Sequence, residues 1–290
     1  MRIGETDIHA DDFVSRASAV LVSHYHRDHL RGIKRKRPPK QVVCSPLTAD
    51  LLEKVERFDP DRLYPLDIGE SVEINDRGRV VRVTALDANH CPGSIMFYLE
   101  SDGLRVLYTG DFRLNDVVRR SVKALPALDV LYMDATFDAP HYRFPSQKEA
   151  VEEVLELMRR RDGRTVYLAI YGIGKNQILE AAFREFGHAF YTPPDKRRVY
   201  ETIGMGRLIT PDRAATPFRA YARGYLEHYF QWTREFREGR PLIIVPTGWQ
   251  DLRQTHDAYR YVAYSEHCDH AELQAFRRLV QAAQVVKIHG

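Results

Sequence analysis

Apolar residues in the first 135 positions form short runs separated by turn residues, and this pattern predicts strands. The runs of strand length are 19–22, 41–44, 80–84, 94–99 and 105–109. A Ser-Asp-Gly sequence at 101–103 predicts a hairpin between the last two runs. Helices are predicted to interrupt the strands, the first over 46–52. Ser146 is predicted to cap a longer amphipathic helix over 147–161.

The pattern changes after Gly163, where apolar runs of strand length alternate with amphipathic segments of helix length. Strands are predicted over 165–170 and 241–245, and a helix is predicted over 176–186. Such alternation is typical of a parallel sheet covered by helices. The predicted organisation is therefore a first domain, an inserted α/β module and the return of the first domain, with the bounds 1–164, 165–260 and 261–290.

The polar residues that follow the first apolar run carry the strongest chemical signal. The segment Ser23-His24-Tyr25-His26-Arg27-Asp28-His29 holds three histidines and a carboxylate within six residues. Side chains two positions apart in an extended chain project to the same side, so His24 and His26 can bind one ion together. Asp28 and His29 are adjacent, and they reach the same place only from a loop or a helix start. The segment therefore predicts two neighbouring metal positions.

Two further segments place metal-binding side chains at predicted strand ends. His90 precedes a Pro-Gly turn, and Asp111 follows Gly110 after the run 105–109. Alone, His90 would more often be a core or surface histidine, and Asp111 a turn residue. Together with the first loop they supply what two zinc ions need: three histidines for one ion, a carboxylate and a histidine for the other, and one bridging carboxylate. These residues are His24, His26 and His90, then Asp28 and His29, and then Asp111.

The motifs together resemble the metallo-β-lactamase-fold nucleases of the β-CASP group, such as Artemis and the DNA interstrand cross-link repair exonucleases. The His-x-His-x-Asp-His motif alone would indicate only a hydrolase of that superfamily. The resemblance implies an α/β fold, an αββα metallo-β-lactamase sandwich with an inserted α/β β-CASP module. The matching segments run in family order over nearly the whole chain, at 10–13, 23–29, 86–93, 108–113, 131–137, 144–147, 173–175, 246–249 and 264–267.

The resemblance also implies roles for residues that the pattern alone does not single out. Asp11 would support the metal loop from behind the ligands. Asp134 and His267 would lie beside the scissile phosphate, where His267 protonates the leaving oxygen and Asp134 orients it. Asp28 would act in catalysis as well as in metal binding. The alternatives are a turn or capping role for Asp134 and a noncatalytic role for His267.

Two features, at three positions, depart from the DNA-directed branch of the family. That branch usually carries Val in its last motif, whereas this chain has His289 at the aligned position. A histidine there resembles the RNA-directed enzymes and some bacterial DNA exonucleases, in which it completes the second metal site; the alternative is a frayed terminal side chain. Cys268 and Asp269 stand where cross-link repair exonucleases have serines that hold a 5′-phosphate. A preference for a 5′-phosphate therefore does not transfer to this chain.

The cofactor and the nucleic-acid contacts follow from these motifs and from the basic residues. Zn²⁺ is expected, with two ions favoured over one and with Mg²⁺ or Mn²⁺ as alternatives. The net charge of +3 gives no global signal for nucleic acid, but one basic run lies just downstream of the metal loop. This run, together with a lysine before the helix at 176–186, is expected to contact phosphates. These residues are Lys34, Arg35, Lys36, Arg37 and Lys175, and an ordinary surface lysine is the alternative for the last.

Composition and cysteine usage limit the cellular setting. Three cysteines at unrelated spacings argue against a disulfide framework and for a reducing compartment. No apolar stretch approaches the roughly 18–20 residues of a membrane span. We therefore expect a protein of the cytoplasm, or of the nucleus if the source organism is eukaryotic. Nucleic acid is the expected partner and no membrane is expected; the sequence does not fix the oligomeric state, and a monomer is favoured.

The function expected from the sequence is a metal-dependent nuclease that hydrolyses phosphodiester bonds of DNA. A 5′-to-3′ exonuclease in DNA repair is favoured. An RNA-processing β-CASP ribonuclease with the same metal site is the first alternative, and His289 favours it. A small-molecule metallohydrolase is more remote because of the inserted module and Asp134, and a scaffold without activity is disfavoured because every ligand position is filled.

Overall fold

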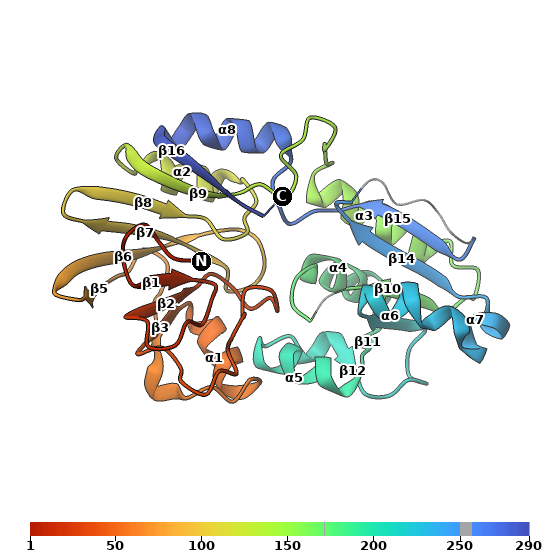
Figure 1. Ribbon diagram of the computed structural model, residues 1–290. Coiled ribbons are helices and arrows are strands. Elements are labelled where there is room, and N and C mark those ends of the chain that lie inside the picture. The colour runs from red at the N-terminus through yellow and green to blue at the C-terminus, as the bar shows by residue number, and fades with distance from the viewer. Residues whose placement is uncertain (171, 250–256, 290) are drawn as a thin grey trace. The chain divides into compact units, whose positions relative to one another are not determined.

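The computed structural model describes residues 1–170, 172–249 and 257–289, and the chain divides into two compact units (Figure 1). The first unit comprises 1–141 and 267–290, and the second comprises 142–266. The insertion thus begins earlier than the predicted residue 165, because helix α3 (Gln147–Arg159) packs into the core of the second unit through Ala150, Val154 and Met158. It ends later than the predicted residue 260, because β15 (Tyr259–Ala263) pairs with the second unit's sheet.

The first unit contains two sheets. One has four parallel strands in the order β1-β2-β3-β4, and every residue of β2 and β3 is buried. Helix α1 (Pro46–Lys54) covers this sheet and begins at Ser45, whose side chain accepts a hydrogen bond from the backbone N–H of Thr48. The four strands are Ile8–Ala10, Ala19–Val22, Val42–Cys44 and Leu63–Pro65.

The other sheet has six strands in the order β16-β9-β8-β7-β6-β5. Helices α2 (Asp116–Lys123) and α8 (His270–Val280) cover its outer face. A buried cluster that includes Leu21 of the first sheet and Phe97 of the second fills the space between the sheets. The unit is thus the predicted αββα sandwich. Its second sheet comprises β5 Ser71–Asp76, β6 Arg79–Asp87, β7 Ile95–Ser101, β8 Leu104–Tyr108, β9 Leu128–Asp134 and β16 Ala282–Ile288.

The strand directions bring several strand ends to one edge of this second sheet. β16, β9 and β8 are parallel, and β6 runs in the same direction because β7 is antiparallel to both of its neighbours. The carboxyl ends of these four strands therefore lie at the same edge. Residues that directly follow them in sequence, including His90, Asp111 and His289, are placed at that edge by topology alone.

The second unit is built on a six-stranded sheet in the order β12-β11-β13-β10-β14-β15, in which every pairing is parallel. The predicted parallel α/β module is therefore confirmed. Its other strands are β10 Val166–Ala169, β11 Phe190–Tyr191, β12 Ile209–Thr210, β13 Phe218–Tyr221 and β14 Leu242–Thr247, and its other helices are α4 Asn176–Phe186, α5 Pro194–Thr202, α6 Arg223–His228 and α7 Arg234–Gly239. Three 3₁₀ turns complete the described elements, η1 Pro60–Arg62, η2 Gly206–Leu208 and η3 Phe230–Trp232.

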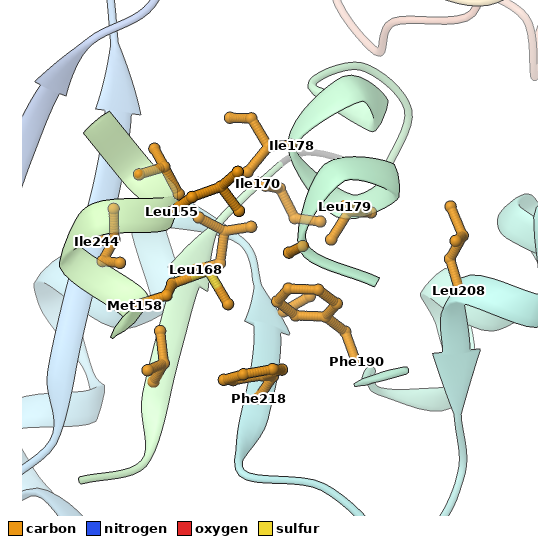
Figure 2. Packing of buried hydrophobic residues seen from close by; sticks show 14 of the residues in the cluster. Leu155, Met158, Leu168, Ile170, Ile178, Leu179, Phe190, Leu208, Phe218 and Ile244 are labelled. Atoms are coloured by element: carbon orange, nitrogen blue, oxygen red, sulfur yellow. The ribbon is translucent and has the colours of Figure 1, made fainter. Parts of the chain in front are cut away.

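Helices cover both faces of this parallel sheet. Figure 2 shows Leu155 and Met158 of α3 and Ile178 and Leu179 of α4 packed around Leu168 of β10. On the opposite face, a second cluster joins Tyr167, Leu226, Phe230 and Ile243 beneath α6 and η3. Because helices cover both faces, every residue of β10 and β14 is buried, and most of these residues are apolar. Among the described residues, no helix is long and apolar enough to cross a membrane.

Candidate metal centre

Three histidine rings from two loops of the first unit face one another. His24 and His26 follow β2, and His90 follows β6. The Nε2 atom of His24 lies 2.9 Å from Nδ1 of His26, which lies 3.2 Å from Nε2 of His90. Donor atoms around a tetrahedral zinc ion are about 3.3 Å apart, since Zn–N bonds are about 2.0–2.1 Å long. Both distances are close to this value, and ligand atoms of all three histidines lie within 4.8 Å of one another, so they could hold one ion.

Asp111 lies beside this group and connects it to a second one. Its Oδ2 atom is 3.6 Å from Nε2 of His24 and 3.7 Å from Nε2 of His90. The same oxygen is 3.3 Å from Nε2 of His29, and that nitrogen is 3.6 Å from Oδ2 of Asp28. The structure thus brings the predicted bridging carboxylate between the two predicted ligand groups.

His289 also reaches this place from the end of β16. Its Nε2 atom lies 3.4 Å from Oδ1 of Asp111, and its ring centroid lies 5.0 Å from that of His29. The side chain is 38 % exposed. A position beside Asp111 and His29 is what a ligand of the second ion would need, and it disfavours the alternative of a frayed terminal side chain.

A glycine before the bridging carboxylate permits a close approach of two loops. Gly110 has φ of +51°, and a Cβ at this position would lie 2.5 Å from Cβ of Ser23. Any residue with a Cβ would be strained at this φ and would clash with Ser23. Gly110 therefore lets Asp111 turn from the end of β8 towards the histidines that follow β2.

Asp11 fixes the metal loop from behind. Its Oδ1 accepts a hydrogen bond from the backbone N–H of Ser23, and its Oδ2 accepts one from the hydroxyl of Tyr108. Oδ2 also lies 2.7 Å from Nδ1 of His29. A carboxylate on the far nitrogen of a ligand histidine sets its tautomer and orientation, which is the role that the sequence predicted for Asp11. Tyr108 and Ser23 were not predicted as anchors, although both belong to matched motifs.

The carboxylates and histidines of the site shift one another's pKa values in both directions. Burial would lower the pKa of His29, but the negative charge of Asp11, a hydrogen bond to Asp11 and the closeness of Asp111 outweigh burial and raise the pKa to about 11. The pKa of Asp111 is held well below its usual value, since contacts with His29, His267 and His24 outweigh burial. Burial, followed by repulsion from His29, lowers the pKa of His24.

The donor set also passes a test of fit to a metal ion. Nε2 of His29 and Oδ1 of Asp111 are buried, and each makes no hydrogen bond with any described residue. A buried polar atom without a hydrogen bond is costly unless another partner satisfies it. Nitrogen and oxygen donors of this kind suit zinc and other divalent transition metals. His24, His29 and Asp111 form one of three clusters in the described chain that can hold an ion.

One member of these clusters was not predicted from the sequence. The ligand atom of Cys91 lies within 4.8 Å of those of His24, His26 and His90. Its position directly after His90 was the only signal that could have pointed to it. Thiolate is a zinc ligand, so Cys91 is an additional donor available at this position.

His267 and Asp134 form a pair at the edge of the centre. Nδ1 of His267 lies 2.8 Å from Oδ2 of Asp134, and its Nε2 lies 3.9 Å from Oδ2 of Asp111. Asp134 ends β9, and its Oδ1 accepts hydrogen bonds from the backbone and hydroxyl of Thr136. Asp134 thus serves as a turn residue and orients His267 at the same time, so the two predicted alternatives are compatible.

The residues after His267 are structural. The backbone N–H of Cys268 donates to the carbonyl of Phe112, and its buried Sγ accepts from the backbone of Leu114. Asp269 caps α8, where its Oδ1 accepts a 2.8 Å hydrogen bond from the backbone of Glu272. These contacts give Cys268 a role in core packing and Asp269 a role in helix capping.

The basic run is exposed, as a nucleic-acid contact requires. Lys34, Arg35, Lys36 and Arg37 are all exposed. Only weak ion pairs hold the first two, with Nζ of Lys34 at 3.8 Å from Glu56 and Arg35 at 3.8 Å from Asp12. Exposed pairs of this length contribute little, so the side chains can rearrange around a phosphate.

Lys175 has different surroundings from those expected of a surface lysine. It is 7 % exposed and stands at the N-cap of α4 with φ of +56°. Its backbone N–H donates to Oε1 of Glu266 at 2.5 Å. Burial lowers its pKa to about 8, although Glu266 opposes the change. The alternative of an ordinary surface lysine is therefore wrong.

A second buried lysine in the same unit yields a stability prediction. Burial lowers the pKa of Lys196 to about 8, and within the described part of the chain its Nζ donates only to the carbonyl of Ile170. Below pH 8 the amine is charged in both the folded and the unfolded state. Burial of this charge then lowers the free energy of unfolding by about 3 kcal/mol, because the pKa falls from 10.5 to about 8 and one pKa unit is about 1.4 kcal/mol. Between about pH 8 and 10.5 the unfolded chain binds more protons, so the free energy of unfolding rises with pH and the penalty disappears.

We therefore expect Lys196→Met to raise the free energy of unfolding at pH 7 by roughly 2 kcal/mol, after the loss of one hydrogen bond of about 1 kcal/mol. The gain should shrink as the pH rises from 8 towards 10. Urea unfolding of parent and variant at several pH values measures both effects. A gain that does not vary with pH would show that the charge of Lys196 is not its cause.

Comparisons with known proteins agree with this geometry. A family model described as "Beta-lactamase superfamily domain" matches residues 5–169. The chain is 32 % identical over 94 % of its length to the 5′ exonuclease Apollo of Gallus gallus and 30 % identical, again over 94 %, to that of Rattus norvegicus. It is 27 % identical over 94 % of its length to the DNA cross-link repair 1A protein of Homo sapiens.

The chain covers only part of these relatives and has a structural neighbour of unknown function. It spans 58 %, 51 % and 28 % of their respective lengths. A crystal structure of a protein of unknown function from Enterococcus faecalis V583 superposes with a TM-score of 0.65 at 15 % identity, over 93 % of this chain and 75 % of that one. This likeness shows a common fold.

Proposed function

The chain belongs to the metallo-β-lactamase superfamily, and on that premise we propose that it is a metal-dependent nuclease that hydrolyses phosphodiester bonds of DNA. The single observation that carries this proposal is the convergence of two ligand groups on Asp111, beside the His267–Asp134 pair. A 5′-to-3′ exonuclease in cross-link or end repair is the favoured activity, since relatives along most of the chain bear the names of 5′ exonucleases and DNA cross-link repair proteins.

Two zinc ions fit this donor set best. His24, His26 and His90 would hold one, and Asp28, His29 and His289 the other, with Asp111 between them. When bound, such ions lower the pKa of a coordinated water towards neutrality and offset negative charge on phosphate oxygens. Mg²⁺ or Mn²⁺ are alternatives for the second position, where two carboxylates contribute oxygen ligands.

The chain's own residues supply proton transfer and orientation. The Nδ1–H group of His267 donates to Asp134, which holds the ring with Nε2 towards Asp111. From that position Nε2 would give a proton to the departing 3′ oxygen of the substrate. Asp11 keeps His29 in one orientation through its Nδ1, and Gly110 keeps Asp111 in reach of both ligand groups.

Nucleic-acid binding is proposed for residues outside the centre. Lys34, Arg35, Lys36 and Arg37 would neutralise backbone phosphates, which is the main source of non-specific affinity for DNA. Lys175 is only 7 % exposed, so a contact between its side chain and a backbone phosphate is not proposed.

RNA is the second candidate substrate because of His289. The DNA-directed branch that this chain resembles usually has Val at this position, whereas here the imidazole lies 3.4 Å from Asp111. A ribonuclease with the same centre would use the same residues in the same roles. The names of the relatives favour DNA, so DNA is the substrate that we propose.

End-labelled substrates test the proposed function. Purified protein should convert 5′-phosphorylated single-stranded DNA, labelled at its 3′ end, into a ladder that shortens with time in the presence of Zn²⁺, Mn²⁺ or Mg²⁺. Asp28→Ala should lose this activity, and its fold should be unaffected because the Asp28 side chain is 71 % exposed.

The controls distinguish DNA from RNA as substrate, terminal from internal cleavage, and activity of this centre from that of a contaminant. Asp129→Ala removes an exposed carboxylate that accepts from the backbone of Arg105, and it should cleave like the parent. A ladder on RNA alone would favour the ribonuclease, and internal cuts would indicate an endonuclease. If Asp28→Ala cleaves as fast as the parent, the activity does not come from this centre.

A further inference from the structure

A pocket lies at the amino-terminal edge of the parallel sheet in the second unit. It has a volume of about 480 Å³, within the range of roughly 300–1,000 Å³ typical of small-molecule sites. The segments that line it directly precede β10, β14 and β15 or belong to α7, and none contributes to the metal centre. The lining residues are Arg164, Phe236, Arg237, Arg240, Pro241, Asp257 and Ala258.

Positive charge dominates this pocket. Three arginines face one carboxylate, so the lining carries a net charge of +2 by its formal charges. Neither Arg237 nor Arg240 forms an ion pair or a side-chain hydrogen bond with any described residue. The neighbouring arginines do, because Arg234 pairs with Glu238 and Arg213 with Glu235. Of the three arginines in the lining, Arg237 and Arg240 thus form no ion pair with a described residue, whereas Nη2 of Arg164 lies 4.0 Å from Oδ2 of Asp162.

Arg164 supplies the third guanidinium group of the pocket, and hydrogen bonds hold it in place. Its Nε donates to the carbonyl of Arg161 at 2.9 Å, and its Nη2 donates to the carbonyl of Arg160. These bonds hold the guanidinium group in the turn before β10. A guanidinium held in place loses less conformational freedom when it binds an anion.

Apart from Asp257, whose carboxylate opposes an anion, the remaining lining is apolar. The Phe236 ring packs edge-on against Phe230 with a centroid distance of 5.6 Å, and it lies 6.4 Å from the ring of Tyr259. Pro241 and Ala258 are buried beside it. A flat aromatic ligand can pack on such a surface, as aromatic faces do with one another.

The backbone at Arg240 is unusual for a large side chain. This residue ends α7 with φ of +44° and ψ of +57°, the left-handed conformation in which glycine is the usual helix terminator. A side chain with a Cβ costs roughly 1–2 kcal/mol there. Three other arginines, Arg16, Arg57 and Arg77, have the same left-handed backbone, so the angle alone indicates no function for Arg240.

We propose that this pocket binds a nucleoside 5′-monophosphate. The phosphate, with a charge of roughly −1.5 to −2, would contact the guanidinium groups of Arg237 and Arg240, which suit phosphate better than ammonium groups. The base would pack against Phe236 and Pro241. Because the pocket shares no residue with the metal centre, this binding does not depend on the proposed nuclease activity.

Calorimetric titration of the full chain with deoxyadenosine 5′-monophosphate in EDTA tests the proposal. The variant Arg237→Ala/Arg240→Gly should weaken binding at least tenfold. Arg240→Gly removes the guanidinium group and suits the left-handed backbone, so the fold should be retained. Arg234→Ala, on the same helix but outside the pocket, should bind within twofold of the parent.

Further ligands and one variant decide what the pocket recognises. Deoxyadenosine and inorganic phosphate should each bind at least tenfold more weakly than the monophosphate. Asp28→Ala should bind it like the parent, whereas loss of binding in that variant would assign the nucleotide to the metal centre and overturn the proposal. Equal affinity for inorganic phosphate, undiminished binding by the double variant, or binding of an oligonucleotide but not of the monophosphate would also overturn it.

Discussion

Asp111→Asn should reduce the cleavage of single-stranded DNA by on the order of 10³-fold or more and should lower the metal content of the purified protein. Asp111 is the only residue whose carboxylate lies within 4 Å of histidines from both ligand groups among the described residues: its distances run from 3.3 Å to His29 to 3.7 Å to His90. Asparagine keeps the shape but removes the negative charge that offsets two cations.

Metal analysis and kinetics on the same preparation measure both effects. Asp129→Ala, on the neighbouring strand β9 but away from the histidines, is the matched control and should keep both metal and activity. Thermal unfolding of the variants excludes a general loss of structure. Full metal content together with parental activity in Asp111→Asn would contradict the proposed bridging role.

Much of the metal centre could be predicted because its ligands occur in short, dense motifs. His24 and His26 follow a clear apolar strand, and the alternation of side chains along an extended segment already places them together. His90 and Asp111 are separated from that loop by more than sixty residues, and their donor chemistry together with the family resemblance joined them to it. Topology accounts for this success, since parallel strands end at a common edge.

Other features could not be predicted because they depend on contacts distant in sequence. Tyr108 donates to Asp11 across 97 positions, and nothing in the local pattern of either residue indicates this bond. Cys268 and Asp269 suggested a changed phosphate site, whereas the structure uses them as a core residue and a helix cap. The role of a polar residue next to a catalytic motif is therefore set by packing.

The bounds of helices and strands could be predicted only where local sequence sets them. The helix predicted over 176–186 is found with those bounds, because Gly187 adopts the left-handed conformation at the C-cap and ends the helix there. The two-residue strands β11 and β12 were not predicted, since two residues have no periodicity. Helix α3 was predicted with its observed first residue and two residues too long at its end. It was assigned to the first domain because the sequence does not show which sheet its apolar face packs against.

His267→Ala should lower the rate of DNA cleavage by about 10²–10⁴-fold without changing the metal content. The expected loss is that of a general acid, because Nδ1 of His267 is held by Asp134 and only Nε2 faces the centre. Asp134→Asn should show a smaller loss, since the imidazole remains but its orientation is less well fixed. Imidazole in the buffer should restore part of the activity of His267→Ala and none of that of Asp111→Asn.

A substrate with a good leaving group distinguishes proton donation from a structural role. The p-nitrophenyl ester of thymidine 5′-monophosphate releases a phenolate that needs no proton, so His267→Ala should cleave it at nearly the parental rate. His270→Ala is the matched control, because its Nδ1 lies 3.2 Å from Asp138 rather than near the ligands, and it should cleave both substrates normally. Equal losses on DNA and on the ester would mean that His267 binds substrate or metal instead of donating a proton, because only proton donation depends on the basicity of the leaving oxygen.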